Sequence, residues 1–405
     1  MTDMNRKKIL LLGGSAQQVP AIKASKAMGY YTVLIDYLPD NPGQYEADIW
    51  YAESTTNVDA VERIAEKEKV SGILAYASDP AALPAAIVAE RLGLPTNPSE
   101  SVEILGVKHK FRKFLQDANF ACPQNISFPA DLSAADLSAQ LTELRFPIVV
   151  KPTDSSGSKG VTFLEDLNGL EEAIAHASAY SRNRILIAEE YIKRGVPFVV
   201  GGDIFVEDGE IVLKGEMACL RDKNGTGLIP IGKMKPAGLT SRQRDKLYEE
   251  LQRLITVLDL KFGEFNIEVL IDSQDQPHFL EVGPRAGGNM IPIQLSDAYN
   301  VDLIKANINV AMGESSGLCP IELDECFMTY VLHSHYDGTF SHVDFSEYVL
   351  PYIYRKVIYK SPGDKVELFD GAGKALGIVF FKFPNEQIMR DVESHLDNYI
   401  KVILK

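Results

Sequence analysis

The chain has 405 residues, of which 45% are hydrophobic and 24% charged, as is ordinary for a globular protein of about two to four domains. Its formal net charge of −15 repels phosphate backbones and argues against a nucleic-acid partner. The four cysteines form no CxxC pair, which favours reduced thiols in the cytosol over a disulfide framework or a cysteine zinc site. The first apolar run, residues 9–12, is too short for a signal peptide or a membrane span.

The first hundred residues alternate short apolar runs with helical stretches. The predicted elements are strands over 9–12, 32–35 and 72–75 and helices over 19–28, 58–67 and 81–92. This alternation predicts a parallel, doubly wound sheet. The loop Gly13-Gly14-Ser15 with Asp36 is similar to a dinucleotide fingerprint but lacks GxGxxG, so we expect a small-molecule site or its remnant there.

The pattern changes from residue 108. The predicted helices are 108–119, 167–178 and 242–258, and the predicted strands are 148–150, 185–188, 198–206, 211–216, 265–271 and 278–282. Consecutive strands joined by short polar turns predict hairpins, antiparallel sheets and an α+β region. Beyond about residue 320 we expect a third segment, with strands over 352–359, 365–368 and 375–381 and a final helix over 386–399.

The most informative segment is 265–290, which predicts a strand, a polar turn and a second strand. A symmetric hairpin pairs Asp272 with Pro277 and therefore Glu268 with Glu281. Like charges that face each other destabilise a sheet unless a cation lies between them, and carboxylate oxygens suit Mg²⁺. The alternative is a solvated hairpin face on which both glutamates point into water.

Arg285 follows this hairpin among the glycines Gly283, Gly287 and Gly288. A guanidinium binds phosphate through a planar fork, and neighbouring glycines let backbone amides approach a ligand. Arg285 is therefore a candidate for stabilising charge on a transferring phosphoryl group. The alternative is an exposed arginine in a surface turn.

Lys151 closes an apolar strand, where a lysine is costly to bury unless an anion neutralises it. The loop 154–160 that follows is small, polar and glycine-containing, and its amides and hydroxyls could cover phosphates. The lysine and this loop together predict a phosphate-binding flap, although most glycine-containing loops are plain turns.

Two further features are weaker on their own. The strand over 185–188 ends at Glu189-Glu190, where the backbone and a glutamate could bind an adenine edge; an exposed acidic strand end is the alternative. Lys108 and Arg112 are four residues apart and share one helix face, which is ordinarily solvated.

The order of these motifs resembles the ATP-grasp superfamily over nearly the whole chain, and in particular its carbamoyl-phosphate-synthase-like and amino-acid-ligase-like branches. The resemblance implies a Rossmann-like N-terminal domain (1–107) and a central ATP-grasp domain of two α+β subdomains (108–318), of which about 120–190 is the flap subdomain. It also implies a smaller C-terminal α+β domain (319–405).

The resemblance further implies roles for single residues. Glu268 and Glu281 would bind Mg²⁺, and Arg285 would be the catalytic residue. ATP would be bound by Lys108, Lys151, Ser156, Gly157, Ser158, Gly160, Glu189, Glu190, Tyr191 and Ile192. The chain departs from the family pattern at Gly283, where an asparagine often provides a further metal ligand, and after Gly195, where a ribose-binding acid is often found.

The activity implied by the resemblance is that of an ATP-dependent carboxylate–amine ligase, which forms an amide through an acyl phosphate and releases ADP and phosphate. Its cofactors are ATP and Mg²⁺, its partners are small-molecule substrates without nucleic acid or membrane, and its location is the cytoplasm. The alternatives are a bicarbonate-activating carboxylase with a carboxyphosphate intermediate and a non-catalytic ATP-binding sensor. The absence of GxGxxG argues against a further alternative, a nicotinamide oxidoreductase.

The sequence does not identify the two substrates or the oligomeric state, and a homodimer stays open. Candidates for substrate contacts, chosen on charge and loop position alone, are Arg221, Lys233, Lys235 and His333. For each of them a solvated surface position is the alternative.

Overall fold

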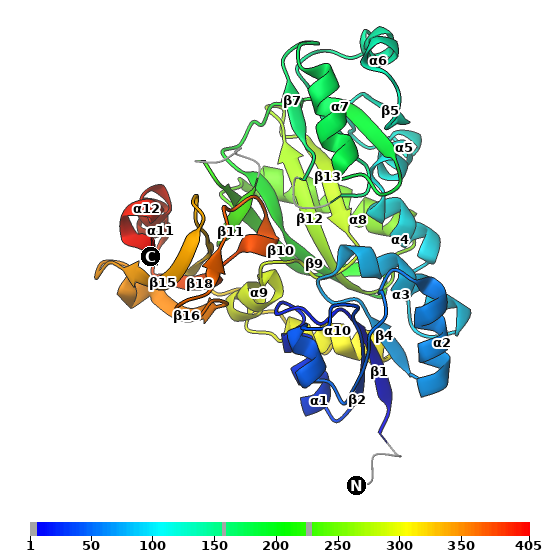
Figure 1. Cartoon of the computed structure of the whole chain (residues 1–405), viewed down its shortest axis with the longest axis vertical. Coiled ribbons are helices and arrows are strands. Elements are labelled where there is room, and N and C mark those ends of the chain that lie inside the picture. The colour runs from blue at the N-terminus through cyan, green and yellow to red at the C-terminus, as the bar shows by residue number, and fades with distance from the viewer. Residues whose placement is uncertain (1–5, 156–158, 224–228) are drawn as a thin grey trace.

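The computed structural model describes residues 6–155, 159–223 and 229–405, and Figure 1 shows how their helices and strands are arranged. They form a parallel sheet at the N-terminus, a large antiparallel sheet at the centre and two smaller sheets. One of the smaller sheets lies at the top of the view, away from the N-terminal unit. This combination agrees with the α/β and α+β regions expected from the sequence.

The N-terminal unit is a four-stranded parallel sheet in the order β3-β2-β1-β4, as predicted. Its elements are β1 (Lys8–Leu12), α1 (Val19–Ala27), β2 (Tyr31–Ile35), β3 (Ile49–Tyr51), α2 (Val58–Glu68), β4 (Gly72–Leu74) and α3 (Asp79–Arg91). Alternate residues of β1 enter different hydrophobic clusters, so both faces of the sheet are covered. Helix α10 (Leu303–Ala311) comes from much later in the chain, and its Ile308 packs with Ile9 and Ile22.

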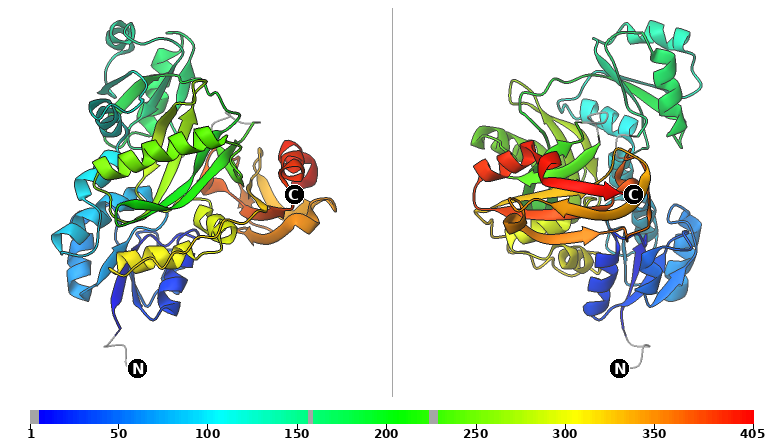
Figure 2. Two further views of the ribbon diagram at one scale, coloured as in Figure 1. Left: turned by 180° about the vertical axis from the view of Figure 1, so that it is seen from behind. Right: turned by 60° about the vertical axis from the view of Figure 1, so that its left-hand side comes forward.

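The central sheet has eight strands in the order β13-β12-β9-β10-β11-β14-β18-β16, all paired antiparallel. Its strands are β9 (Val199–Glu207), β10 (Glu210–Arg221), β11 (Pro230–Lys235), β12 (Gly263–Ile271), β13 (Pro277–Gly283), β14 (Cys326–Leu332), β16 (Ile353–Ile358) and β18 (Gly377–Phe383). Helix α8 (Ser241–Val257) begins at a capping box made by Thr240 and Gln243 and buries Leu251 and Leu254 against the sheet. Figure 2, left, shows α8 crossing one face of the sheet, and α9 (Ile291–Tyr299) packs against β9 and β14.

The smaller sheet at the top of Figure 1 has the order β5-β8-β6-β7 and is built from residues for which a flap subdomain is expected, a division that stays a prediction. Its elements are β5 (Asn125–Pro129), α6 (Ala134–Leu141), β6 (Ile148–Pro152), β7 (Thr162–Leu164), α7 (Leu170–Ala179) and β8 (Ile185–Glu190). Two helices, α4 (Ser99–Gly106) and α5 (Lys108–Asp117), connect the N-terminal unit to it.

The C-terminal segment does not build a sheet entirely of its own, because β14, β16 and β18 extend the central sheet. Its remaining elements are β15 (Gly338–Phe345), β17 (Lys365–Val366), α11 (Glu386–Ser394), α12 (Leu396–Tyr399) and β19 (Ile400–Leu404). The predicted final helix is interrupted at His395, which ends α11 and precedes α12. The domain division at 318/319 stays a prediction. Among the described helices, none is long and apolar enough to span a membrane.

Candidate active site

The β12–β13 hairpin places Glu268 opposite Glu281, as the sequence predicted. The register shifts directly after Glu268, where Leu280 is the extra residue of a bulge. Because of this shift, the predicted pairing of Asp272 with Pro277 is wrong. Asp272 lies in the turn instead, where its carboxylate accepts hydrogen bonds from backbone amides.

Each of the facing glutamates has a cationic partner. Arg221 Nη2 lies 3.2 Å from Glu268 Oε2, and Lys108 Nζ lies 3.3 Å from Glu281 Oε2. Burial alone would raise the pKa of Glu268, but Arg221, Lys233 and Lys108 together outweigh it and lower that pKa below its usual value. Glu268 is therefore ionised at neutral pH.

The two glutamates fit a Mg²⁺ ion. Their carboxylates offer hard oxygen ligands from directly facing positions, and their side chains stay 26% and 29% exposed. Glu281 lines a cleft of about 550 Å³, a size typical of small-molecule sites. The same cleft is lined by Lys108, Asp154, Ser155 and Lys159, and by Asp79 and Pro80 of the N-terminal unit.

Arg285 is held in place by Asp79, the first residue of α3. Its Nε donates to Asp79 Oδ1 at 2.6 Å, and its Nη1 donates to the carbonyl of Ala286 at 3.1 Å. Burial lowers the pKa of a guanidinium, but Asp79, with Glu281 and Asp203, outweighs this and keeps the pKa of Arg285 above its usual value. A Cβ at Gly283 would lie 3.3 Å from Cζ of Arg285, so the glycine leaves room for this guanidinium.

Asp79 was not predicted from the sequence as a site residue. A signal was present, because Asp79 follows a strand of a parallel sheet at its carboxyl end, the edge at which such sheets bind ligands.

A pair of buried carboxyl groups positions the glycine loop that carries Arg285. Asp203 accepts from the backbone amide of Gly287 at 2.8 Å and from Asn266 Nδ2 at 2.7 Å. Burial together with the Asp203 charge raises the pKa of Glu264 well above its usual range, and burial raises the pKa of Asp203 as well. The two carboxyl groups therefore retain a proton between them.

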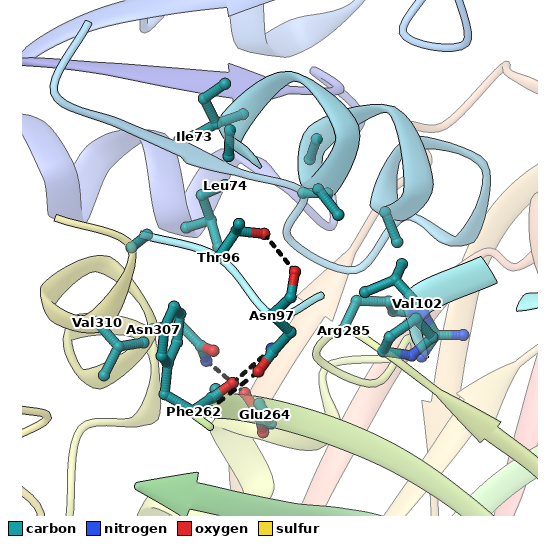
Figure 3. A pocket seen from close by; sticks show the side chains of 18 of the residues that line it. Ile73, Leu74, Thr96, Asn97, Val102, Phe262, Glu264, Arg285, Asn307 and Val310 are labelled. Carbon is teal, nitrogen blue, oxygen red and sulfur yellow. Dashed lines mark hydrogen bonds between the residues drawn. The ribbon is translucent and has the colours of Figure 1, made fainter. Parts of the chain in front are cut away.

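A second cavity, of about 90 Å³, lies between β4 and the start of β12 (Figure 3). Asn307 of α10 donates to Glu264 at 2.5 Å, and Asn97 donates to the carbonyl of Phe262 at 2.9 Å. Arg285 also lines this space. The polar contacts join the N-terminal unit to the central sheet directly behind the Arg285 loop.

Lys151, Glu189 and Arg112 form a buried charged cluster. Glu189 accepts from Lys151 Nζ at 2.5 Å and from Arg112 Nε at 2.7 Å, and Arg112 has no exposed surface. Burial would raise the pKa of Glu189, but Arg112 and Lys151 lower it to about 2. Burial lowers the pKa of Lys151, although Glu189 opposes the effect. The anion required for a buried strand-end lysine is thus provided by the protein itself.

Both carboxylates at the acidic end of β8 have partners within the protein. The carboxylate of Glu189 is taken up by the two cations, and that of Glu190 is bound by the backbone amide and guanidinium of Arg145. Tyr191 is half exposed, its ring lies 5.2 Å from that of Phe163, and its amide donates to a carbonyl of the protein. Adenine recognition at this strand end stays a prediction, and Ile192, two residues after the strand, is partly buried.

Lys108 joins the loop after β6 to the β12–β13 hairpin. Its Nζ donates to the carbonyl of Ser155 at 2.6 Å, in addition to its ion pair with Glu281. Gly160 has a φ of +72°, which favours glycine, and is buried. The remaining expected flap residues lie outside the described part of the chain: Ser156, Gly157 and Ser158.

Three proposed substrate contacts are largely buried. Arg221, described above, is one of them. Lys233 Nζ lies 2.7 Å from the sulfur of Cys219, and Lys235 Nζ lies 3.3 Å from a carboxylate oxygen of Glu322. The alternative that these side chains lie on the solvated surface is wrong for Lys233 and Lys235, because both are buried. Their role in substrate binding stays a prediction.

Comparison with known proteins supports the expected relation to the ATP-grasp superfamily. The family model described as carbamoyl-phosphate synthase L chain, ATP binding domain, matches residues 107–317. The carbamoyl phosphate synthase large chain of Thermoanaerobacter pseudethanolicus is 26% identical over 317 residues, which are 75% of this chain and 28% of that protein. The chain thus spans less than two thirds of the length of the curated relatives that it matches.

Solved structures share the fold. The L-amino acid ligase of Bacillus licheniformis superimposes with a TM-score of 0.83 at 19% identity, over 99% of both chains. The biotin carboxylase domain of 2-oxoglutarate carboxylase from Hydrogenobacter thermophilus, solved with MgADP and bicarbonate, gives a TM-score of 0.76 at 17% identity, over 99% of this chain and 92% of that one.

The family match covers 211 of the 405 residues and contains the lysines, glutamates and arginine of the site. The chain therefore belongs to the family of carbamoyl-phosphate synthase L chain ATP-binding domains, within the ATP-grasp superfamily.

Proposed function

We propose that the chain is an ATP-dependent ligase that joins a carboxylate to an amine through an acyl phosphate and releases ADP and phosphate. The observation that carries this proposal is the pairing of Glu268 with Glu281, which lines the cleft, with Arg221 and Lys108 as their cationic partners. Phosphoryl transfer needs positioned charge more than a covalent nucleophile, and this site is built from positioned charges.

Different residues of the chain would bind Mg²⁺, contact the phosphates and stabilise the transferring group. Glu268 and Glu281 would hold Mg²⁺, which neutralises phosphate charge when it is bound. Lys108 would contact the phosphates from the start of α5. Lys151, held by Glu189 on β6, would contribute positive charge next to the loop 154–160. Arg285, fixed by Asp79, would stabilise the transferring phosphoryl group.

Two bond exchanges complete the reaction. An oxygen of the substrate carboxylate attacks the γ-phosphorus as the bond to ADP breaks. The amine then attacks the acyl carbon, phosphate leaves with the bonding electrons, and the amine proton passes to solvent. Holding both substrates in the cleft of about 550 Å³ would supply much of the rate by orientation.

Trapping of the acyl phosphate tests the proposal. With Mg-ATP, hydroxylamine and a panel of carboxylates, we expect a hydroxamate and an equal amount of ADP for the right carboxylate, even without the natural amine. Formation of AMP and pyrophosphate would contradict the mechanism. ADP formation that depends on bicarbonate alone would replace it by a carboxyphosphate mechanism, and nucleotide binding without turnover across the panel would favour a sensor.

Lys108 provides a test of phosphate binding. Because its Nζ lies beside Glu281, Lys108→Ala should weaken ATP binding by about 10- to 100-fold and adenosine binding much less. Isothermal titration calorimetry measures both affinities. The matched control is Lys113→Ala on the same helix, where the lysine is exposed and pairs with Asp117. Equal weakening of ATP and adenosine by Lys108→Ala would make Lys108 a structural residue.

A further inference from the structure

Three potential metal ligands meet beside the end of β10. Asp222 directly follows this strand, and His333 and His335 follow β14. One donor atom from each of the three lies within 4.8 Å of the others, and His335 Nε2 is 3.7 Å from Asp222 Oδ1. This three-donor cluster shares no residue with the proposed Mg²⁺ pair.

The sheet brings these residues together. Strands β10 and β14 are separated by β11 alone, and the amide of Asp222 donates to the carbonyl of Ile229 at 2.9 Å, just before β11. His333 and His335 are two residues apart beyond the end of β14, a spacing that lets extended backbone present both rings on one side. Only 2% of the Asp222 side chain is exposed.

The hydrogen bond of His333 prepares its ring for a metal. Nδ1 lies 2.7 Å from the carbonyl oxygen of Val331, and a carbonyl oxygen can only accept, so Nδ1 carries the proton. In the neutral ring, Nε2 then has a free lone pair. Metal-binding histidines commonly donate their second ring N–H to a carbonyl or carboxylate in this way. The ring is also held by Phe369, with ring centroids 4.6 Å apart.

We propose that Asp222, His333 and His335 bind a divalent transition-metal ion of the Zn²⁺ type. Two imidazoles and one carboxylate suit Zn²⁺ and leave a coordination position for water or a substrate group, whereas Mg²⁺ prefers oxygen ligands alone. Asp222 follows Arg221, the partner of Glu268, so the metal site borders the proposed site of phosphoryl transfer. The inference does not depend on the reaction proposed above.

Metal titration of the purified full chain tests the site. After chelator treatment, Zn²⁺ is titrated by calorimetry, and Co²⁺ binding is followed by its visible absorption. We expect one high-affinity ion per chain, and at least about tenfold weaker binding in His335→Gln and in Asp222→Asn. The matched control is His342→Gln, because His342 also has a nearby carboxylate, Asp344 at 3.1 Å, but does not belong to the cluster.

The possible results distinguish a metal ion bound by the three-donor cluster from an ion bound elsewhere and from no high-affinity ion. Loss of the high-affinity ion in both cluster variants, with normal binding in His342→Gln and unchanged circular dichroism, supports the proposal. Wild-type affinity in either cluster variant would overturn it, as would a thiolate-to-cobalt band, which would place the ion on a cysteine such as Cys319. Absence of high-affinity binding by the wild-type chain would reduce the cluster to a His335–Asp222 ion pair.

Discussion

Replacing Glu281 with glutamine is expected to lower ATP-dependent turnover by about 100- to 1000-fold while leaving the fold intact. The change removes one of the two facing carboxylates that fit Mg²⁺. Its cost in stability should be small, because the ion pair with Lys108 is partly exposed and the repulsion between the two glutamates disappears. Glu268→Gln should give a comparable loss of turnover.

The chain contains a matched control for this experiment. Glu207 and Glu210 also face each other across antiparallel strands, β9 and β10, but neither lines the cleft. Glu210→Gln therefore removes a like charge from a facing pair without changing the proposed metal site. Release of ADP in the presence of substrate carboxylate measures all three variants. Wild-type turnover in both Glu268→Gln and Glu281→Gln would exclude a shared metal ion.

The sequence predicted those parts of the fold and site that depend on local pattern. Alternating apolar runs and helices give the parallel N-terminal sheet, and the two-residue period of the 265–290 segment gives the facing of Glu268 and Glu281. Buried Lys151 is neutralised by an anion, as predicted, and this anion is Glu189. Each of these inferences uses only residues that lie close together in the sequence.

The features that were missed depend on contacts between segments far apart in the chain. Asp79 reaches Arg285 only because the N-terminal unit lies against the central sheet, and Arg112 is buried only because β8 and β13 pack over its helix. A helix face with basic residues is ordinarily solvated, so no local pattern distinguishes Arg112. The bulge at Leu280 and the extension of the central sheet by β14, β16 and β18 likewise follow from tertiary pairing.

Replacing Glu189 with glutamine is expected to destabilise the chain by about 3–5 kcal/mol, because it leaves Lys151 and Arg112 as buried charges without their anion. The urea midpoint followed by circular dichroism measures the change. The control is Glu190→Gln next to it, since Glu190 pairs with the exposed Arg145 and should cost about 1 kcal/mol or less. A loss of similar size in both variants would mean that the cluster adds no special stability.

Acid provides an independent test of the same cluster. The pKa of Glu189 is about 2 in the folded chain and near its ordinary value of 4.5 in the unfolded chain, so the folded state favours the ionised form. A lowered folded pKa means that the stabilisation is complete above about pH 4.5 and declines as the pH falls toward 2. The difference in urea midpoint between wild type and Glu189→Gln should therefore be constant near neutral pH and shrink across this acid range. Because other carboxylates titrate alike in both proteins, the difference isolates Glu189. A difference that stays constant from pH 7 to about pH 3 would show that Glu189 is not held ionised by Arg112 and Lys151.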